Sequence, residues 1–200
     1  MQVTVIAATQ SPMDVIGIAA GMCYGKPEPS AKRVRRCAEN GHMSVFEHAS
    51  ATFKIEGISR ACLAQLTRHR IASYSVRSQR YCKVGAGGAW YVTPPSVVGT
   101  DAESLFRAQA SDAMWSYQAA IDEGVKPEDA RYLLPEATKT SLVMTINARS
   151  LQNLFTLRLD SHAQWEIRSL AAEVEWVLMD YSKQWYMLME LLQEARNGHC

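Results

Sequence analysis

Residues 49–70 read ASATFKIEGISRACLAQLTRHR, and they join a strand pattern directly to a helix pattern. In the first eight residues, ASATFKIE, apolar and polar side chains alternate, which predicts a strand with one buried face. Ser59 then supplies a helix N-cap, and Leu63 and Leu66 follow at helical spacing. A strand that leads into a helix favours a fold in which a sheet is layered with helices.

Strand and helix patterns continue through the rest of the chain. Residues 2–8 and 140–146 are apolar and rich in β-branched side chains, which predicts two more strands, the first of them buried. Residues 82–100 hold four glycines and two adjacent prolines, which is typical of a loop. Caps and apolar spacing predict helices at 13–22, 31–39, 101–123, 127–134, 148–159 and 163–196. The class is therefore α+β or α/β, in a single domain over residues 1–200 with a long C-terminal helix.

Composition excludes several functional classes. The formal net charge is +1 and 48% of residues are hydrophobic, which argues against a general nucleic-acid coat or a basic membrane-surface protein. The five cysteines include no CxxC pair, so neither a disulfide framework nor a metal site is expected. No segment has about 20 uninterrupted apolar residues and the N-terminus lacks a basic leader, so we expect a cytoplasmic protein without membrane contact.

A basic window without acids runs from residue 57 to residue 100. It contains His69 and six cations, namely Arg60, Arg68, Arg70, Arg77, Arg80 and Lys83. Clustered cations repel one another unless an anion joins them. Three interpretations stay open from charge alone. They are a solvated basic face or arginines paired with distant acids, a nucleic-acid site in which Tyr74 and Tyr81 stack on bases, and a pocket for a phosphorylated small ligand.

Several motifs follow one another in a definite order. Arg68-His69-Arg70 is followed, after seven residues, by Ser78-Gln79-Arg80-Tyr81, and Glu47-His48 precedes both. Downstream come NARSL at 147–151 and LRLDSHAQWEIR at 157–168. Together these blocks resemble the signature of the flavin-dependent thymidylate synthases, and the resemblance covers most of the chain.

This resemblance implies an α+β fold with a mixed or antiparallel sheet flanked by helices. It also implies a homotetramer whose active sites form at subunit interfaces. Members of the family methylate dUMP to dTMP with carbon from 5,10-methylenetetrahydrofolate. FAD carries the hydride, and NADPH usually reduces the flavin. No nucleic-acid partner is expected.

The resemblance also assigns ligand-binding residues. The nucleotide would be bound by Gln65, Arg68, Ser78, Arg80, Arg131 and Arg158, and a hydroxyl beside an arginine fork suits its phosphate. The flavin would be contacted by His48, Arg68, His69, Arg70, Asn147, Arg149, Asn153 and His162. Arg149 and Asn153 are four residues apart and share a helix face. In an unbroken helix, Arg158 and His162 would be stacked in the same way.

Arg158 and His48 are the expected catalytic residues. The resemblance places Arg158 against the uracil ring, where a guanidinium stabilises negative charge that develops on a carbonyl. His48 would lie at the flavin and near the folate. Many members have Asn-Glu where this chain has Ser75-Val76, so a ligand contact of that glutamate is missing here. A flavin- or nucleotide-binding protein without catalysis is therefore one alternative function, and a nucleic-acid-binding module is another.

Overall fold

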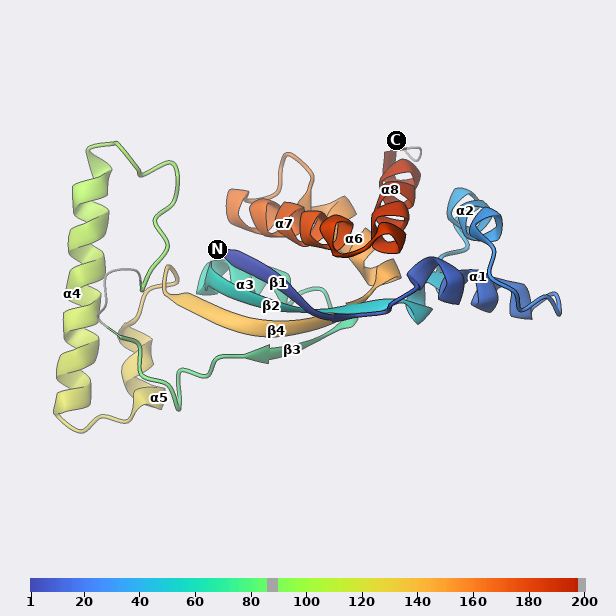
Figure 1. Cartoon of the computed structure of the whole chain (residues 1–200). Coiled ribbons are helices and arrows are strands. Elements are labelled where there is room, and N and C mark those ends of the chain that lie inside the picture. The colour runs from blue at the N-terminus through green and yellow to red at the C-terminus, as the bar shows by residue number, and fades with distance from the viewer. Residues whose placement is uncertain (86–89, 198–200) are drawn as a thin grey trace. The chain divides into compact units, whose positions relative to one another are not determined.

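The computed structural model describes residues 1–85 and 90–197, which form two compact units (Figure 1). The first unit comprises Met1–Ile55, Leu66–Ser75 and the chain from Val143 onward. The second unit comprises Glu56–Gln65 and Val76–Leu142. Both units draw on separated parts of the sequence, so neither is a continuous segment. The expected single domain over residues 1–200 stays a prediction.

Four strands form one sheet in the order β1-β2-β4-β3 (Figure 1). The strands are β1 Gln2–Ala8, β2 Ser50–Ser59, β3 Ala72–Val76 and β4 Lys139–Asn147. Just beyond the end of β2, the Arg60 N–H donates to the carbonyl oxygen of Thr138, next to the start of β4, so these neighbours are antiparallel. The predicted α+β class and its three predicted strands are confirmed.

Two features of the sheet differ from the sequence prediction. β1 is an edge strand in which only Val3 is buried and Ile6 is 54% exposed, so the prediction of a buried strand was wrong. The other edge strand, β3, is not predicted because Ser73 and Ser75 interrupt the apolar pattern. Edge strands are specified by pairing with a neighbour more than by their own hydrophobicity.

The helices of the first unit pack against one another and against β1. They are α1 Pro12–Met22, α2 Ala31–Glu39, the 3-10 helix η1 Met43–His48, α6 Ala148–Arg158, α7 Trp165–Tyr181 and α8 Lys183–Asn197. α7 contacts β1, α6 and α8, and α1 contacts α2, η1 and α8. The core between them contains the fully buried Ile16, Phe46, Phe155 and Trp185. Of these helices, α1, α2, η1 and α6 also supply residues to a groove in this unit.

The predicted C-terminal helix at 163–196 is two helices. Ser182 separates α7 from α8 with extended backbone angles, φ −163° and ψ 158°. Its hydroxyl accepts the Trp185 N–H at 3.3 Å and so caps α8. Trp185 is fully buried, and its indole N–H donates to the Thr9 carbonyl oxygen at 2.9 Å. The break turns α8 back so that it packs on α7.

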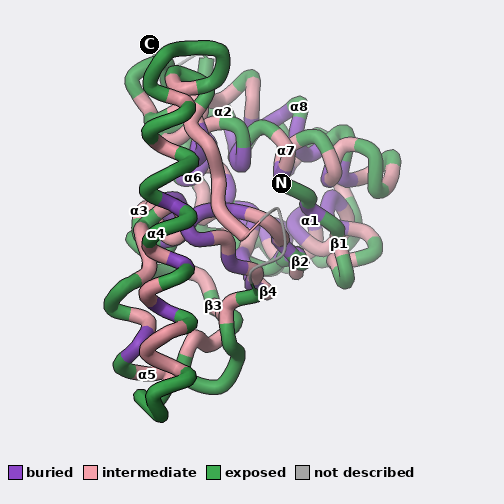
Figure 2. Tube along the Cα trace, turned by 90° about the vertical axis from the view of Figure 1, so that its left-hand side faces the viewer, coloured by how far each residue is buried: buried purple, intermediate pink, exposed green. Residues whose placement is uncertain are grey.

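The second unit has a small core of its own. Its helices are α4 Ala102–Asp122, α5 Pro127–Ala130 and the 3-10 helix η2 Arg131–Leu133, and α3 Arg60–Leu66 lies mostly within it. Met114, Tyr117 and Ala130 are buried together, with Trp90 packed against them. Figure 2 shows that most of α4 is exposed or half-buried. No helix in residues 1–85 or 90–197 is long and apolar enough to cross a membrane.

Candidate active site

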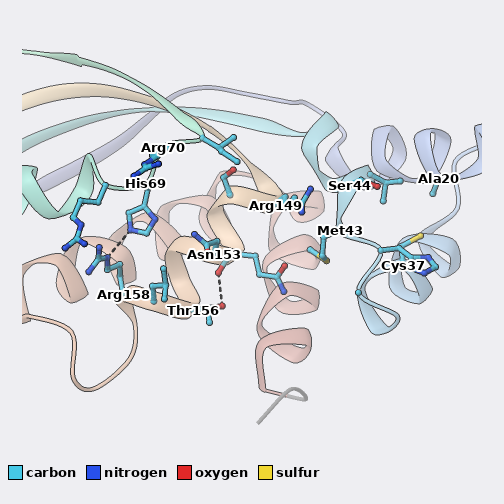
Figure 3. Close-up of a pocket in the computed structure, with 18 of the residues that line it drawn as sticks. Ala20, Cys37, Met43, Ser44, His69, Arg70, Arg149, Asn153, Thr156 and Arg158 are labelled. Carbon is cyan, nitrogen blue, oxygen red and sulfur yellow. Dashed lines mark hydrogen bonds between the residues drawn. The ribbon is translucent and has the colours of Figure 1, made fainter.

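A groove of about 1390 Å³ lies in the first unit (Figure 3). One wall is α6, from Arg149 to Arg158, and another is the turn at 68–71 between α3 and β3. The third wall comes from the ends of α1 and α2 and from residues 41–45. Pockets for small molecules usually measure about 300–1,000 Å³, so this groove is large enough for an extended ligand.

The Arg68-His69-Arg70 turn presents its three side chains to this groove. His69 is only 7% exposed, whereas Arg68 and Arg70 on either side of it are exposed. All three residues line the groove. The buried imidazole anchors the turn, and the two flanking guanidinium groups make this end of the groove strongly positive.

Arg158 lies at the same end of the groove, where it is hydrogen-bonded to His69. Its Nε–H donates to His69 Nε2 at 3.0 Å, a bond drawn as a dashed line in Figure 3. Burial, followed by the charge of Arg158, lowers the pKa of His69 from its usual 6.5. His69 is therefore neutral near pH 7, with its proton on Nδ1 and an acceptor lone pair on Nε2.

α6 supplies the polar wall of the groove. Arg149 and Asn153 both line it, which confirms that they share a helix face (Figure 3). Arg149 forms an ion pair with Glu47, the acid of the predicted Glu-His element. Asn147 precedes the helix, and its Oδ1 accepts the Ser150 N–H at 2.9 Å. Asn147 thus caps α6 and is not part of the groove lining.

Two predicted flavin contacts lie outside this groove. α6 ends at Arg158, so the stacking of Arg158 and His162 that an unbroken helix would allow does not form. The His162 side chain is 94% exposed, and its Nδ1 lies 2.9 Å from Asp160 Oδ1. His48, at the end of η1, is also exposed and does not line the groove. Their roles at the flavin stay predictions.

The predicted phosphate ligands gather in the second unit around Glu128. Arg80 Nε donates to the Glu128 carboxylate at 2.6 Å, and Arg131 Nε donates to the Glu128 carbonyl oxygen at 2.9 Å. The Ser78 hydroxyl accepts the Arg80 N–H at 3.1 Å. Three of the predicted ligands are therefore connected through hydrogen bonds. Gln65 lies on α3 of the same unit.

A second, smaller groove of about 560 Å³ borders this cluster. Ser78 lines it, together with Arg77, Gln79, Trp90 and Lys139. Arg80 of the basic window forms an ion pair with the distant acid Glu128. Pairing of the arginines with distant acids was one of the interpretations left open by charge alone. Arg77 and Lys139 give the groove a positive lining that suits an anion.

Several groove residues carry no signal in the sequence. Cys23, Tyr24, Cys37, His42 and Met43 line the third wall of the large groove, but no motif marks them. They come together only because α1 packs on α2 and on η1. Burial is the main cause that raises the pKa of the Cys37 thiol, so this cysteine is not activated.

The two cysteines within the basic window differ in burial. Cys62 is fully buried. Cys82, by contrast, is exposed and lines the second groove. Neither forms a disulfide bond with another described residue.

Fold and site together define a class. The described residues of this α+β protein form a large groove with arginines in its walls and a hydroxyl–arginine cluster, and both features are typical of proteins that bind phosphorylated ligands. Comparison with known proteins narrows this class. The sequence model of a family described as thymidylate synthase complementing protein matches residues 4–180.

Individual relatives agree with this match. The flavin-dependent thymidylate synthase of Geobacter sulfurreducens is 41% identical over 186 residues, which cover 87% of this chain and 80% of the relative. The enzyme of the same name from Pyrococcus furiosus is 37% identical over 195 residues, or 90% of this chain and 78% of the relative. A crystal structure of thymidylate synthase X from Helicobacter pylori with FAD and dUMP superposes with a TM-score of 0.77. It has 30% identity and covers 96% of this chain and 99% of that one. This chain belongs to the flavin-dependent thymidylate synthase family.

Proposed function

We propose that the protein converts dUMP to dTMP by reductive methylation, with FAD as its cofactor. The single observation that carries the proposal is the large groove that brings together residues of the Arg-His-Arg turn and of α6. These residues include parts of three motifs by which the sequence resembles the family, namely the Arg-His-Arg turn, NARSL and LRLDSHAQWEIR. Relatives named flavin-dependent thymidylate synthase, and a solved relative with FAD and dUMP, support the same assignment.

The groove fits FAD in size and charge. FAD is an extended dinucleotide with an anionic pyrophosphate and a flat apolar ring. The groove has three arginines that can face the pyrophosphate, namely Arg68, Arg70 and Arg149. Met43, Ile71 and Leu157 add apolar surface for a ring. When bound, FAD supplies the hydride for the reduction.

Arg158 is the residue that we assign to the uracil ring. His69 holds its Nε at 3.0 Å, which fixes the plane of the guanidinium group in the groove. A preorganised guanidinium stabilises negative charge on a uracil carbonyl as the neighbouring carbon receives hydride. Because His69 is neutral at pH 7, it keeps the lone pair that orients Arg158.

The Ser78–Arg80–Arg131 cluster is the proposed phosphate site of dUMP. A hydroxyl beside two guanidinium groups matches the donors that a phosphate accepts. In the structure Arg80 is paired with the Glu128 carboxylate. A bound phosphate would therefore either displace this carboxylate from Arg80 or share the guanidinium group with it. Gln65 would assist from α3. Val76 provides no polar group, so the nucleotide contact typical of other members would be absent here.

Four finer assignments rest on the family alone. They are 5,10-methylenetetrahydrofolate as carbon donor, NADPH as reductant, a homotetramer with shared active sites, and a cytoplasmic location. His48, Asn147 and His162 lie outside the groove lining, and two of them are exposed. If each protomer contributed ligand-binding residues to the active site of a neighbouring protomer, those residues would be exposed in a single protomer. The proposal therefore keeps these three residues as flavin contacts at a subunit interface.

Purified protein provides the test. It should be yellow, or gain a flavin absorption spectrum when FAD is added, and it should form dTMP from dUMP, methylenetetrahydrofolate and NADPH. A colourless protein that gains no flavin spectrum would refute the assignment of the groove. A yellow protein that forms no dTMP would instead indicate a flavin- or nucleotide-binding protein without catalysis. This is the alternative that Val76 suggests.

A further inference from the structure

The hydroxyl group of Tyr74 joins two points of the Arg-His-Arg turn. It lies 3.0 Å from the carbonyl oxygen of Leu66 and 2.9 Å from that of His69. A phenol has one proton, so it shares this proton between the two acceptors. Leu66 is the last residue of α3, and its carbonyl is one that helical hydrogen bonds leave unsatisfied. Tyr74 therefore connects the end of α3 to the turn that follows it.

The backbone of His69 is held on both sides by this arrangement. Its N–H donates to Leu66 at 3.1 Å, and its carbonyl oxygen accepts from Tyr74. Its side chain is held as well, because Nε2 accepts from Arg158. Tyr74 itself is anchored in β3, a strand of the sheet. A rigid element thus reaches Arg158 through two successive hydrogen-bonded contacts.

We infer that Tyr74 is a positioning residue that orients His69, and through His69 the guanidinium of Arg158, from behind the groove. Tyr74 is half-buried and does not line the groove, so it acts on a ligand only through His69. Burial raises the pKa of its hydroxyl to about 12, so the hydroxyl keeps its proton as a donor at neutral pH. Its use in this contact also argues against the alternative in which Tyr74 stacks on nucleic-acid bases.

The part of this inference that concerns catalysis rests on the proposed function, but its first test does not. In Tyr74→Phe the ring stays and only the hydroxyl is lost, so the chain should fold. His69 should then gain mobility and hydration, and its pKa should rise toward 6.5 because burial is the main cause that lowers it. The ring protons of the histidines report this pKa by NMR titration, and His69→Gln assigns the signal.

Tyr186→Phe is the matched control. Its hydroxyl is also hydrogen-bonded, to Glu190, but it lies on α8 and outside the groove. It should leave the His69 titration unchanged. An unchanged His69 titration in Tyr74→Phe as well would overturn the inference, whatever the protein's activity. Fast hydrogen exchange at the His69 amide of the wild-type protein would overturn it without any variant.

The second test measures turnover. In Tyr74→Phe the hydroxyl no longer holds the His69 backbone, and through it Arg158, so kcat should fall about fivefold to tenfold. The KM for dUMP should change less than twofold, because Tyr74 touches no ligand. A structural role alone would lower the melting temperature without this split between kcat and KM. If wild-type protein shows no dTMP formation, the proposed function fails while the His69 titration still decides the positioning role.

Discussion

Replacement of Arg158 with alanine should separate catalysis from folding. The side chain donates to His69 Nε2 at 3.0 Å, and that atom belongs to a residue that lines the groove. Water in the groove can replace the lost donor, so the cost should be about 1 kcal/mol in free energy of unfolding. For a chain of 200 residues this lowers the melting temperature by about 2–4 °C.

The loss of activity should be much larger. A preorganised donor that faces developing negative charge contributes about 10²–10³ in kcat when it is removed. The assay is dTMP formation with saturating FAD and dUMP, measured beside a thermal melt of the same sample. Arg158→Lys should recover the charge but not the Nε–H bond, so its kcat should lie between those of wild type and Arg158→Ala.

Arg168→Ala is the control for this experiment. Arg168 also donates one hydrogen bond, to the Ser161 carbonyl oxygen at 2.8 Å, but it does not line the groove. It should melt slightly earlier than wild type with normal kcat. If Arg158→Ala retained a kcat within threefold of wild type, the assigned role of Arg158 would be refuted. Removal of the Arg158 side chain should also raise the pKa of His69, because the Arg158 charge lowers that pKa.

Three further predictions concern stability. Because the folded pKa of His69 lies below 6.5, the unfolded chain binds this proton more readily. The free energy of unfolding should therefore fall as the pH drops below about 6.5, by up to about 1.4 kcal/mol per pH unit down to the folded pKa, as denaturant titrations would measure. Ser59→Ala removes the hydroxyl that accepts the Cys62 N–H at 2.9 Å and should destabilise the protein by about 1 kcal/mol. Gly124→Ala places a side chain at φ +87° and should cost about 1 kcal/mol in a thermal melt, although the space around Gly124 is open.

Each of these has a control within the same chain. His69→Gln should flatten the stability profile near pH 6, and an unchanged slope would contradict the role of His69. Ser104→Ala loses only an exposed hydrogen bond to the Asp101 carbonyl oxygen. If Ser104→Ala and Ser59→Ala lowered the free energy of unfolding equally, the N-cap role of Ser59 would be contradicted. Gly85→Ala also meets open space but at an ordinary φ, so equal losses at Gly85 and Gly124 would rule out backbone strain as the cause.

Local patterns in the sequence predicted most of the elements. Ser59 begins α3 as expected, and Ser30 begins α2 in the same way, since each hydroxyl accepts an N–H three residues ahead. The shared face of Arg149 and Asn153 follows from helical spacing alone. These patterns involve residues within about one helical turn of each other. They can therefore be interpreted without knowledge of the tertiary fold.

Contacts between distant residues were decided only by the tertiary structure. His69 and Arg158 are 89 residues apart, and Glu47 and Arg149 are 102 apart, so no local spacing brings either pair together. The break at Ser182 is also invisible in a continuous apolar pattern, because it accompanies a contact between residues far apart in the sequence, the hydrogen bond from the buried Trp185 indole to the Thr9 carbonyl oxygen. The sequence by itself determined the family, the order of the motifs and the residue types of the site. Only folding decided which of those residues share a groove, since burial and hydrogen bonding between remote segments depend on how the elements pack.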